Sequence, residues 1–428
     1  MTDWPSTTIG EIFDIGSGKT MSSKVRADAE LTPFLRTSNV FWDRIDLSKV
    51  DEMPMLLWER EEKSLLPGDL LVCEGGEIGR AAVWEGQAES ISFQNHLHRL
   101  RRKNDDIDPG FYAYFLQSAF TQLGIYEGAG NKTTIPNLSR SNLAALDVPK
   151  PDFDEQRDIR LVLKRVRAAM EKADDGIHVA DELKRAAMRE LFARGVRGEA
   201  QKDSEIGPVP ESWNVVEFGS VRRRLQYGTS VRCDTKPTPF PVLRIPNIGQ
   251  GKVDANDLKY AHFNEKDAEN HRLEKGDMIF IRTNGVIERL GCCAVFEGQP
   301  EGALFASYLI RAQPDLEALN PGFAAHYFGS PVGTRIIAGR ATPAADGKYN
   351  LNTGIIDSLP IPLPPTLEEQ QEVAEILDAI DAKIELHKRK RAVLEELFRG
   401  LLHKLMTGEI RVAELDLSAL ETKQEVAA

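Results

Sequence analysis

The chain has 428 residues, of which 41% are hydrophobic and 28% charged, and its formal net charge is −12. This composition is ordinary for soluble protein and long enough for two or three domains, while the negative charge argues against a simple nucleic-acid binder. We expect neither a membrane span nor a secretory signal, because no apolar stretch approaches 18 residues and the N-terminus lacks a basic region before an apolar core. The four cysteines include no CxxC pair, which fits a cytoplasmic protein and disfavours a structural zinc site.

The first 152 residues alternate short apolar runs with turn residues, a pattern typical of a β-rich module. The clearest strand signal is Leu70–Val72, which follows a Pro-Gly-Asp turn, and a short helix is expected from Phe111 to Thr121. Residues 210–365 have the same character, with a short helix expected from Phe323 to Phe328. Each module is therefore predicted to be an α+β domain with an irregular sheet.

A long helix with a heptad pattern is predicted after each module, in the segments 153–198 and 366–412. Asp154 is the expected N-cap of the first helix, and Thr366 that of the second, with Glu369 completing a capping box. Each helix would be about 60 Å long at 1.5 Å per residue. The seam positions recur at alternating spacings of four and three residues, and they are Ile159, Leu163, Val166, Met170, Ala173, Ile177, Ala180, Lys184, Ala187 and Leu191 in the first helix and Val373, Leu377, Ile380, Ile384, His387, Arg391, Leu394, Phe398, Leu401 and Leu405 in the second.

A seam of this length needs a partner, so the two helices, one after each module, are predicted to pack on each other. Each seam position of the first helix lies 214 residues before its counterpart in the second. Both helices follow their module in the same chain direction, so a pseudo-two-fold arrangement gives an antiparallel coiled coil. The polar seam residues Lys184, His387 and Arg391 are expected to fix its register. The alternative, in which each helix lies only on its own module, stays open. Residues 199–209 are expected to form a linker, and residues 413–428 a C-terminal tail.

Six blocks of sequence recur in the same order in both modules, which predicts two copies of one fold with small loop insertions. The matching blocks are Gly10 with Gly219 (preceded by Trp4 and Trp213), Pro33–Val40 with Pro241–Ile248, Gly68–Val72 with Gly276–Phe280, Ala81–Gly86 with Cys293–Gly298, Pro109–Phe111 with Pro321–Phe323, and Leu146–Pro149 with Leu359–Pro362. The copies differ in charge: residues 1–152 hold 16 Lys+Arg against 23 Asp+Glu, whereas residues 210–365 hold 17 of each.

Segments that look like catalytic motifs lack residues that their chemistry requires. Gly16–Thr20 resembles a phosphate-binding loop, but Phe13 stands where that motif needs a glycine. Glu61–Lys63 has the residue types of a nuclease site, yet it lies in a charged stretch before a turn. The pair His96 and His98 is more typical of a strand surface than of a metal site. We therefore predict no catalytic, cofactor-binding or metal-binding residues in this chain.

The junctions between modules and helices, in their doubled order, resemble those of the DNA specificity subunit of Type I restriction-modification systems. The junctions are Leu146–Pro151 followed by Glu155-Gln156, and Leu359–Pro364 followed by Glu369-Gln370. The resemblance covers residues 1 to about 412. It implies two target recognition domains, each reading one half of a bipartite site in double-stranded DNA, and an antiparallel coiled coil that sets the spacer and docks two methyltransferase subunits.

The same resemblance implies a non-catalytic subunit with no cofactor of its own. Its methyltransferase partners would hold S-adenosylmethionine, and restriction subunits using ATP and Mg²⁺ would join them for cleavage. The alternative is a non-catalytic protein scaffold with duplicated binding modules, which the net acidity favours.

Polar clusters in loops are the candidates for DNA contact, because base edges are read by side chains with hydrogen-bond donors and acceptors. The candidates are Arg36, Thr37, Asn39, Arg80, Asn95, Lys132 and Thr133 in the first module and Arg244, Asn247, Arg282, Thr283, Asn284, Arg289, Lys348 and Asn350 in the second. Arg36 and Arg244 are at equivalent positions, which is equally consistent with a framework role. The first module has Glu74 where the second has Arg282, which leaves open whether it uses that loop on DNA.

Overall fold

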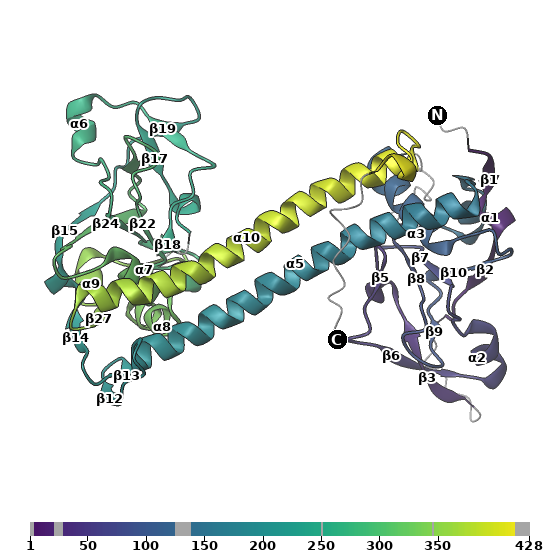
Figure 1. Cartoon of the computed structure of the whole chain (residues 1–428), viewed down its shortest axis with the longest axis horizontal. Helices are drawn as coiled ribbons and strands as arrows, with labels where there is room; N and C mark the ends of the chain where they lie inside the picture. The colour runs from purple at the N-terminus through teal and green to yellow at the C-terminus, as the bar shows by residue number, and fades with distance from the viewer. Residues whose placement is uncertain (1–3, 21–28, 125–137, 250, 345, 416–428) are drawn as a thin grey trace. The chain divides into compact units, whose positions relative to one another are not determined.

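The computed structural model describes residues 4–20, 29–124, 138–249, 251–344 and 346–415. The chain divides into two compact units, one of residues 1–173 and 389–428 and the other of residues 174–388. Each unit holds one β-rich module and one part of each long helix (Figure 1). None of the helices in the described ranges is both long and apolar enough to cross a membrane.

Small sheets and short helices build the first module (Figure 1). Its main antiparallel sheet has the order β2 (Phe13–Ser17), β10 (Leu97–Arg102), β7 (Leu70–Cys73) and β8 (Ala81–Val83). Its second sheet has the order β6 (Asp51–Met55), β3 (Glu30–Leu35) and β9 (Ser92–Phe93). The strand β1 (Ser6–Thr8) pairs with β11 (Asp147–Pro149), and β4 (Val40–Phe41) pairs with β5 (Arg44–Ile45). The short helices are α1 (Ile9–Ile12), α2 (Leu57–Lys63), α3 (Pro109–Ser118) and α4 (Arg140–Ala144).

The second module has the corresponding elements. Its main sheet has the order β15 (Arg222–Tyr227), β24 (Leu309–Pro314), β20 (Met278–Ile281), β22 (Cys293–Val295) and β18 (Gly251–Lys252). Its second sheet has the order β16 (Cys233–Asp234), β19 (Lys259–Ala261), β17 (Pro241–Leu243) and β23 (Leu304–Phe305). A three-stranded ribbon joins β21 (Thr283–Asn284), β26 (Tyr349–Asn350) and β25 (Thr342–Pro343), and β14 (Asn214–Glu217) pairs with β27 (Pro360–Leu363). The helices are α6 (Glu265–Glu269), α7 (Pro321–Gly329), α8 (Pro331–Arg340) and α9 (Thr353–Asp357).

The two modules share one framework, which confirms the predicted duplication and the α+β class. In both, the strand after the Gly-Asp turn pairs with a six-residue strand on one side and a three-residue strand on the other: β7 lies between β10 and β8, and β20 lies between β24 and β22. In both, the second sheet contains one parallel pair, β3 with β9 and β17 with β23. The short helices predicted near Phe111 and Phe323 are α3 and α7, capped by Asp108 and Asn320.

The strand after each Gly-Asp turn is apolar along its whole length because both of its faces are buried. Leu70 and Val72 of β7 belong to the same core as the long helices, whereas Leu71 and Cys73 face a second core between the two sheets. The strand β20 divides its side chains in the same way. Each module is therefore a layered structure whose main core continues directly into the helices.

The long helices are α5 (Phe153–Arg194) and α10 (Leu367–Met406). Thr366 caps α10 as predicted, since its hydroxyl accepts a hydrogen bond from the Glu369 N–H at 3.3 Å. The prediction that Asp154 caps α5 is wrong. Asp152 accepts from the Glu155 N–H at 2.8 Å, and Asp154 lies within the first helical turn.

The seam positions predicted for α5 and α10 are all buried or half-buried. In the first unit the beginning of α5 packs with the end of α10. Arg411 pairs with Glu155 there, and the Arg167 guanidinium lies 4.8 Å from the centre of the Phe398 ring. Residue numbers rise along one helix as they fall along the other, so the packing is antiparallel.

The second unit repeats this packing with the helices exchanged, because the beginning of α10 contacts the end of α5. Lys184 donates to both carboxylate oxygens of Asp381, at 2.5 and 2.7 Å. A Cβ at Gly176 would lie 2.6 Å from the His387 ring, so glycine allows this close approach. The antiparallel coiled coil is thus confirmed within each unit, and Lys184 forms a polar layer in it.

Residues 199–209, expected to be a linker, contain most of a β-hairpin. The strand β12 (Gln201–Ser204) pairs with β13 (Gly207–Pro210). Gly207 closes the turn with a φ of 108°, a conformation that favours glycine. Ile206 and Val209 are buried in the core of the second unit. The hairpin is therefore folded against the second module, and the apolar residues Ile206 and Val209 within this polar segment are the sequence signal for it.

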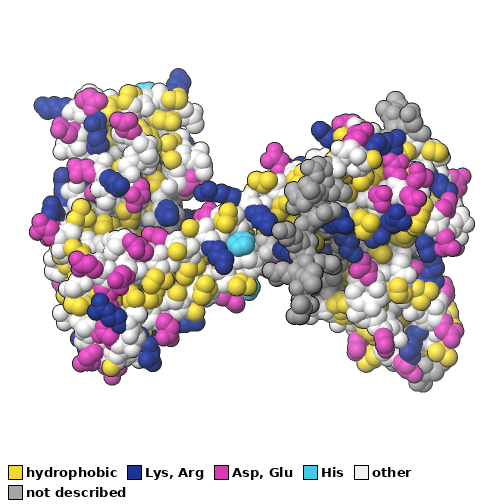
Figure 2. Space-filling view, viewed as in Figure 1, with side chains coloured by type: hydrophobic (Ala, Val, Ile, Leu, Met, Phe, Trp, Pro, Cys, Tyr) yellow, Lys and Arg dark blue, Asp and Glu magenta, His cyan; other side chains and the backbone are white. Residues whose placement is uncertain are grey.

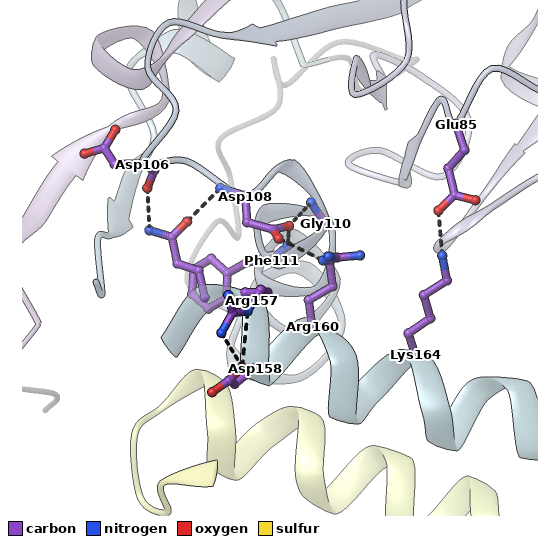
Figure 3. Close-up of polar contacts among 10 residues, drawn as sticks. Glu85, Asp106, Asp108, Gly110, Phe111, Arg157, Asp158, Arg160 and Lys164 are labelled. Atoms are coloured by element: carbon purple, nitrogen blue, oxygen red, sulfur yellow. Dashed lines mark hydrogen bonds and ion pairs between the residues drawn. The ribbon is translucent and has the colours of Figure 1, made fainter. Parts of the chain in front are cut away.

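A buried glutamine attaches each long helix to the module before it. Gln156 is fully buried, and its carbonyl oxygen accepts from the Asp108 N–H at 2.9 Å while its amide donates to the Pro151 carbonyl at 2.9 Å. Asp108 in turn caps α3 by accepting from Gly110 and Phe111 and binds Arg160 of α5 at 2.8 Å (Figure 3). In the second module Gln370 accepts from the Asn320 N–H at 2.7 Å and donates to the Ala318 carbonyl at 3.0 Å.

The glutamate before each glutamine holds the first tryptophan of the module. The Trp4 indole N–H donates to Glu155 at 2.9 Å, and the Trp213 indole N–H donates to Glu369 at 3.3 Å. The Glu-Gln pair at both junctions therefore joins the start of the module, its internal helix and the long helix at one point.

Replacing Gln156 with leucine should lower the free energy of unfolding by roughly 2–4 kcal/mol, because the Asp108 N–H and two carbonyls lose their buried partner. Urea denaturation of the full chain, followed by circular dichroism, measures the change. Glu171→Leu, at an exposed position of α5, is the control and should change stability by about 0.5 kcal/mol or less. Equal stability of the two variants would contradict the role assigned to Gln156.

Candidate nucleic-acid interface

One edge of the main sheet in the second module gathers three segments of chain. They are the end of β15, the residue after β20 and the turn before β24. The Arg282 N–H donates to the Tyr308 carbonyl at 3.1 Å, and the Ser307 N–H donates to the Thr229 carbonyl at 2.7 Å. We call the surface formed by Tyr227, Arg282, Tyr308 and the neighbouring ribbon the module-two edge.

The ribbon brings together three of the predicted DNA-binding residues of the module-two edge. Thr283 pairs with Asn350, and Asn284 pairs with Tyr349, across β21 and β26. All four side chains are half-buried. Thr283 and Asn350 are 67 residues apart in the chain, so only the fold makes them neighbours.

Arg282 lies at the centre of the module-two edge. Its guanidinium group stands 4.9 Å from the centre of the Tyr227 ring, and its Nη1 atom donates to the Ser307 carbonyl at 3.2 Å. The side chain of Tyr308 is 58% exposed and that of Tyr227 is 39% exposed. The edge thus combines a cation, two accessible aromatic rings and amide and hydroxyl groups, which are the side chains that contact nucleic acids.

Two further candidates of the second module, Lys348 and Arg289, lie outside this centre. Lys348 is exposed next to β26 and donates to Asp346 at 2.7 Å, and this hydrogen bond raises the pKa of the lysine. Arg289 is exposed in the 3-10 turn Ile287–Arg289, which leads to β22. Both remain cationic and accessible, as phosphate contacts require.

The first module has an equivalent edge with different side chains. The Glu74 N–H donates to the His96 carbonyl at 2.9 Å, and the Asn95 N–H donates to the Lys19 carbonyl at 3.0 Å. Asn95 therefore belongs to this surface, which we call the module-one edge. Lys132 and Thr133 lie outside the described residues.

Asn39 and Asn247 are framework residues, which removes both from the base-reading candidates. Asn39 is 5% exposed, and its amide accepts from the Arg36 N–H at 2.8 Å and donates to two carbonyls in the segment 46–49. Asn247 repeats each of these contacts, with the Arg244 N–H at 2.8 Å and two carbonyls in the segment 254–257. All of their amide hydrogen-bonding groups are thus turned into the module.

The equivalent arginines next to these asparagines form matching ion pairs. Arg36 binds Asp51 at 2.6 Å, and Arg244 binds Asp257 at 2.9 Å. The two arginines thus have equivalent partners in the two modules, and Arg36 is exposed. Thr37 is half-buried, and its carbonyl accepts from Arg80 at 3.1 Å.

Arg80 lies in an arginine-lined pocket of about 470 Å³ in the first unit. The Arg44 and Arg80 guanidinium groups stand 4.7 and 5.3 Å from the centre of the Phe41 ring. Arg399 of α10 also lines this pocket. No sequence motif indicates Arg44 or Arg399, because only the tertiary fold brings these residues together.

The segment Gly16–Thr20 contains the end of β2 and the residues after it, of which Lys19 forms an isolated β-bridge with Gln94. A Cβ at Gly18 would lie 2.2 Å from the Gln94 carbonyl oxygen, and the equivalent Gly228 has the same close contact with the Ala306 carbonyl oxygen. Lys19 pairs with Glu59. The glycine is therefore required by a close backbone approach, and the following lysine neutralises a carboxylate.

His96 and His98 have different surroundings, because His96 precedes β10 and His98 lies within it. His96 is exposed near Glu74, whereas His98 is 2% exposed with Nε2 at 2.8 Å from the Leu138 carbonyl oxygen. Burial lowers the pKa of His98. The neutral form of His98 is thus favoured as a buried hydrogen-bonding group of the framework.

His326, Asp378 and Asp381 each place one potential metal-ligand atom within 4.8 Å of the others. The Lys184 ammonium group occupies both oxygens of Asp381, and the His326 ring lies 3.2 Å from Asp378. The hydrogen bond from His326 lowers the pKa of Asp378. These contacts form an ion-pair network between α7 and the coiled coil.

Acidic and basic side chains are interspersed over both modules on the face shown in Figure 2. The arginines named above are therefore local sources of positive charge on a chain with a net charge of −12.

Two stretches of the chain, residues 1–175 and 210–396, match the family model described as the Type I restriction modification DNA specificity domain. The chain belongs to this family. It is a specificity subunit, and its function is DNA sequence specificity in a Type I restriction-modification system.

Relatives of this specificity subunit match it over nearly the whole chain. It is 25% identical over 424 residues to the putative type I restriction enzyme MjaX specificity subunit of Methanocaldococcus jannaschii, covering 96% of this chain and 94% of that protein. It is 22% identical over 387 residues to the EcoKI specificity subunit of Escherichia coli, covering 88% and 82%. The fold resembles the crystal structure of the Type I S subunit from M. genitalium, with a TM-score of 0.59 at 16% identity over 94% and 96% of the chains.

Replacing Asn247 with alanine in this specificity subunit should lower stability by roughly 2 kcal/mol without changing the DNA sequence that is recognised, because the amide supports a loop from inside. Urea denaturation measures the first effect, and mapping of methylated sites measures the second. Asn256→Ala, at an exposed position nearby, is the matched control. A changed recognition sequence in the Asn247 variant alone would show that this asparagine reads bases.

Proposed function

We propose that each module of this specificity subunit reads one half of a bipartite site in double-stranded DNA. The observation that carries the proposal is the repeated sheet edge, on which one backbone framework presents Glu74 and His96 in one module and Arg282 and Tyr308 in the other. Two copies of one fold with different edge side chains are suited to two different half-sites, since base edges are distinguished by their donors and acceptors.

Phosphate contacts are proposed for exposed cations beside these edges. In the first unit these are Arg44 of the module and Arg399 of α10, at the pocket that Arg80 lines, and in the second module they are Lys348 and Arg289. The net charge of −12 opposes binding of DNA by the chain alone. Partner subunits therefore share the phosphate contacts in this proposal.

Two methyltransferase subunits are proposed to dock on the coiled coil. Val179 and Leu183 of α5 are 62% and 50% exposed, and their counterparts 214 residues later, Val393 and Leu397 of α10, are 64% and 41% exposed. Each pair immediately precedes two seam positions and lies on the flank of its helix. An exposed apolar pair that occurs once on each helix at equivalent positions supports two equivalent partners.

The chain is proposed to act without catalysis of its own. The methyltransferase subunits would supply S-adenosylmethionine and the methyl transfer, and restriction subunits with ATP and Mg²⁺ would supply cleavage. A solved structure with a TM-score of 0.55 to this chain was described in terms of complex assembly and conformational transition of a Type I system. The role of this chain would be to choose the site on which its partners act.

The net acidity favours a second candidate function, a protein scaffold with duplicated binding modules. A scaffold would have no salt-dependent affinity for DNA even with its partners present. DNA recognition predicts an affinity that falls steeply with salt, because phosphate contacts release counterions. A titration of the assembled complex with duplex DNA at several salt concentrations separates the two.

Exchange of residues 210–365 for the equivalent module of another family member should change one half of the methylated sequence and leave the other half intact. The measurement is methylome sequencing of a host that carries the active methyltransferase, with and without the chain. The methyltransferase alone is the control and should add no methylation at the split sequence. A change in both halves would overturn the assignment of one module to one half-site.

Leu183→Asp and Leu397→Asp should each weaken one methyltransferase contact by roughly 10-fold or more, because a charge replaces an apolar group at the interface. Native mass spectrometry of the complex should then show loss of one methyltransferase copy in each variant and of both copies in the double variant. Leu386→Asp is the matched control, since Leu386 is 65% exposed but its counterpart is the polar Lys172. Unchanged stoichiometry in the double variant would refute docking at these pairs.

A further inference from the structure

Glu74 occupies a fixed place on the module-one edge, directly after the buried strand β7. Its N–H donates to the His96 carbonyl at 2.9 Å, and its carbonyl accepts from the Leu138 N–H at 2.7 Å. The N–H and the carbonyl of Glu74 thus both form backbone hydrogen bonds. The side chain of this residue can therefore vary without changing them. The side chain lies 3.6 Å from the His96 ring and is 20% exposed.

Arg282 occupies the same place on the module-two edge, directly after β20. Its N–H donates to the Tyr308 carbonyl at 3.1 Å, and its carbonyl accepts from the Leu351 N–H at 2.7 Å. The same two hydrogen bonds therefore fix the backbone in both modules. Residues 74 and 282 therefore occupy equivalent positions in the two modules, yet one carries a carboxylate and the other a guanidinium group.

The two side chains have opposite hydrogen-bonding character. A carboxylate only accepts hydrogen bonds, whereas a guanidinium group only donates them. Arg282 uses Nη1 for the Ser307 carbonyl, and the Tyr227 ring holds the plane of its guanidinium group from one side. Stacking of this kind orients the fork of donors and reduces the freedom that binding would remove.

The surroundings leave both side chains room to meet a ligand. In the first module Gly75 and Gly76 follow Glu74, and a Cβ at either would meet no atom within 4 Å. In the second module Thr283 and Asn284 follow Arg282 and pair with β26, so amide and hydroxyl groups stand beside the guanidinium group. An open glycine turn and a polar ribbon both permit close approach to a groove.

We propose that Glu74 and Arg282 are equivalent specificity-determining residues that read bases of opposite hydrogen-bonding character. Arg282 would donate two hydrogen bonds to a guanine, whose major-groove edge presents two acceptors, and Glu74 would accept a hydrogen bond from the exocyclic amino group of a cytosine. This inference rests on the proposed function, since it assigns one base pair in each half-site.

The test uses the full chain assembled with its methyltransferase, and its readout is the methylated sequence in each half-site. Arg282→Gln should replace guanine by adenine at one position of one half-site, because glutamine pairs with the donor and acceptor of adenine, and the preference for guanine should fall roughly 10- to 100-fold. Glu74→Gln should change one position of the other half-site. Glu61→Gln and Arg223→Gln, at exposed positions away from the edges, are the matched controls and should change neither half.

Arg282→Lys keeps the positive charge but loses the planar fork, so it should methylate the original site with weaker discrimination at the same position. Urea denaturation of each purified variant confirms folding. Folded Arg282 and Glu74 variants that retain the original sequence in both halves would overturn the inference while leaving the proposed function intact. A wild-type complex that methylates no split sequence would overturn the proposed function itself.

Discussion

The attachment of each module to its long helix depends on one buried glutamine. Gln156 and Gln370 each bond the N-terminal end of a short internal helix, while the preceding glutamates hold the first tryptophan of the module. A buried amide with several hydrogen-bond partners fixes both the orientation of the long helix and its distance from the module. Any change in either would leave a buried polar group without a partner. The orientation of each module edge relative to the adjoining helix segment therefore follows from a Glu-Gln dipeptide, which explains why that dipeptide appears at both junctions.

In each module some residues maintain the fold and others vary at the module edge, and this separation explains how one fold can have two specificities. Asn39 and Asn247 make the same internal contacts, and they support the loop from within. The residues that differ, Glu74 and Arg282, have their backbone groups satisfied in the same way. Variation in the edge side chain thus costs the framework little, because the two backbone hydrogen bonds that fix this position do not depend on the side chain. The difference in charge between the modules is one result of this freedom.

The sequence predicts the features that depend on a local pattern of burial. The seams of α5 and α10, the module repeat and the strand after each Gly-Asp turn are all visible as apolar spacing. Sequence alone does not distinguish Asp152 from Asp154 as the N-cap of α5, because aspartate is an equally good capping residue at either position, and the structure selects Asp152. The asparagines at 39 and 247 have the residue type of base readers, and burial alone reveals their framework role. Pockets built from distant segments, such as the one lined by Arg44 and Arg399, leave no trace in sequence spacing.

The coiled coil also specifies which helix pairs with which. In the first unit Arg167 lies over Phe398, and at the equivalent layer of the second unit Asp381 pairs with Lys184. If two copies of α5 paired antiparallel in this register, Arg167 would face Lys184, and the two positive charges would repel. If two copies of α10 paired, Asp381 would face Phe398 without a cation, which leaves a carboxylate unpaired in the seam. Of these three pairings, that of α5 with α10 satisfies both layers, so the exchange of charge between equivalent positions favours this pairing over that of two copies of either helix.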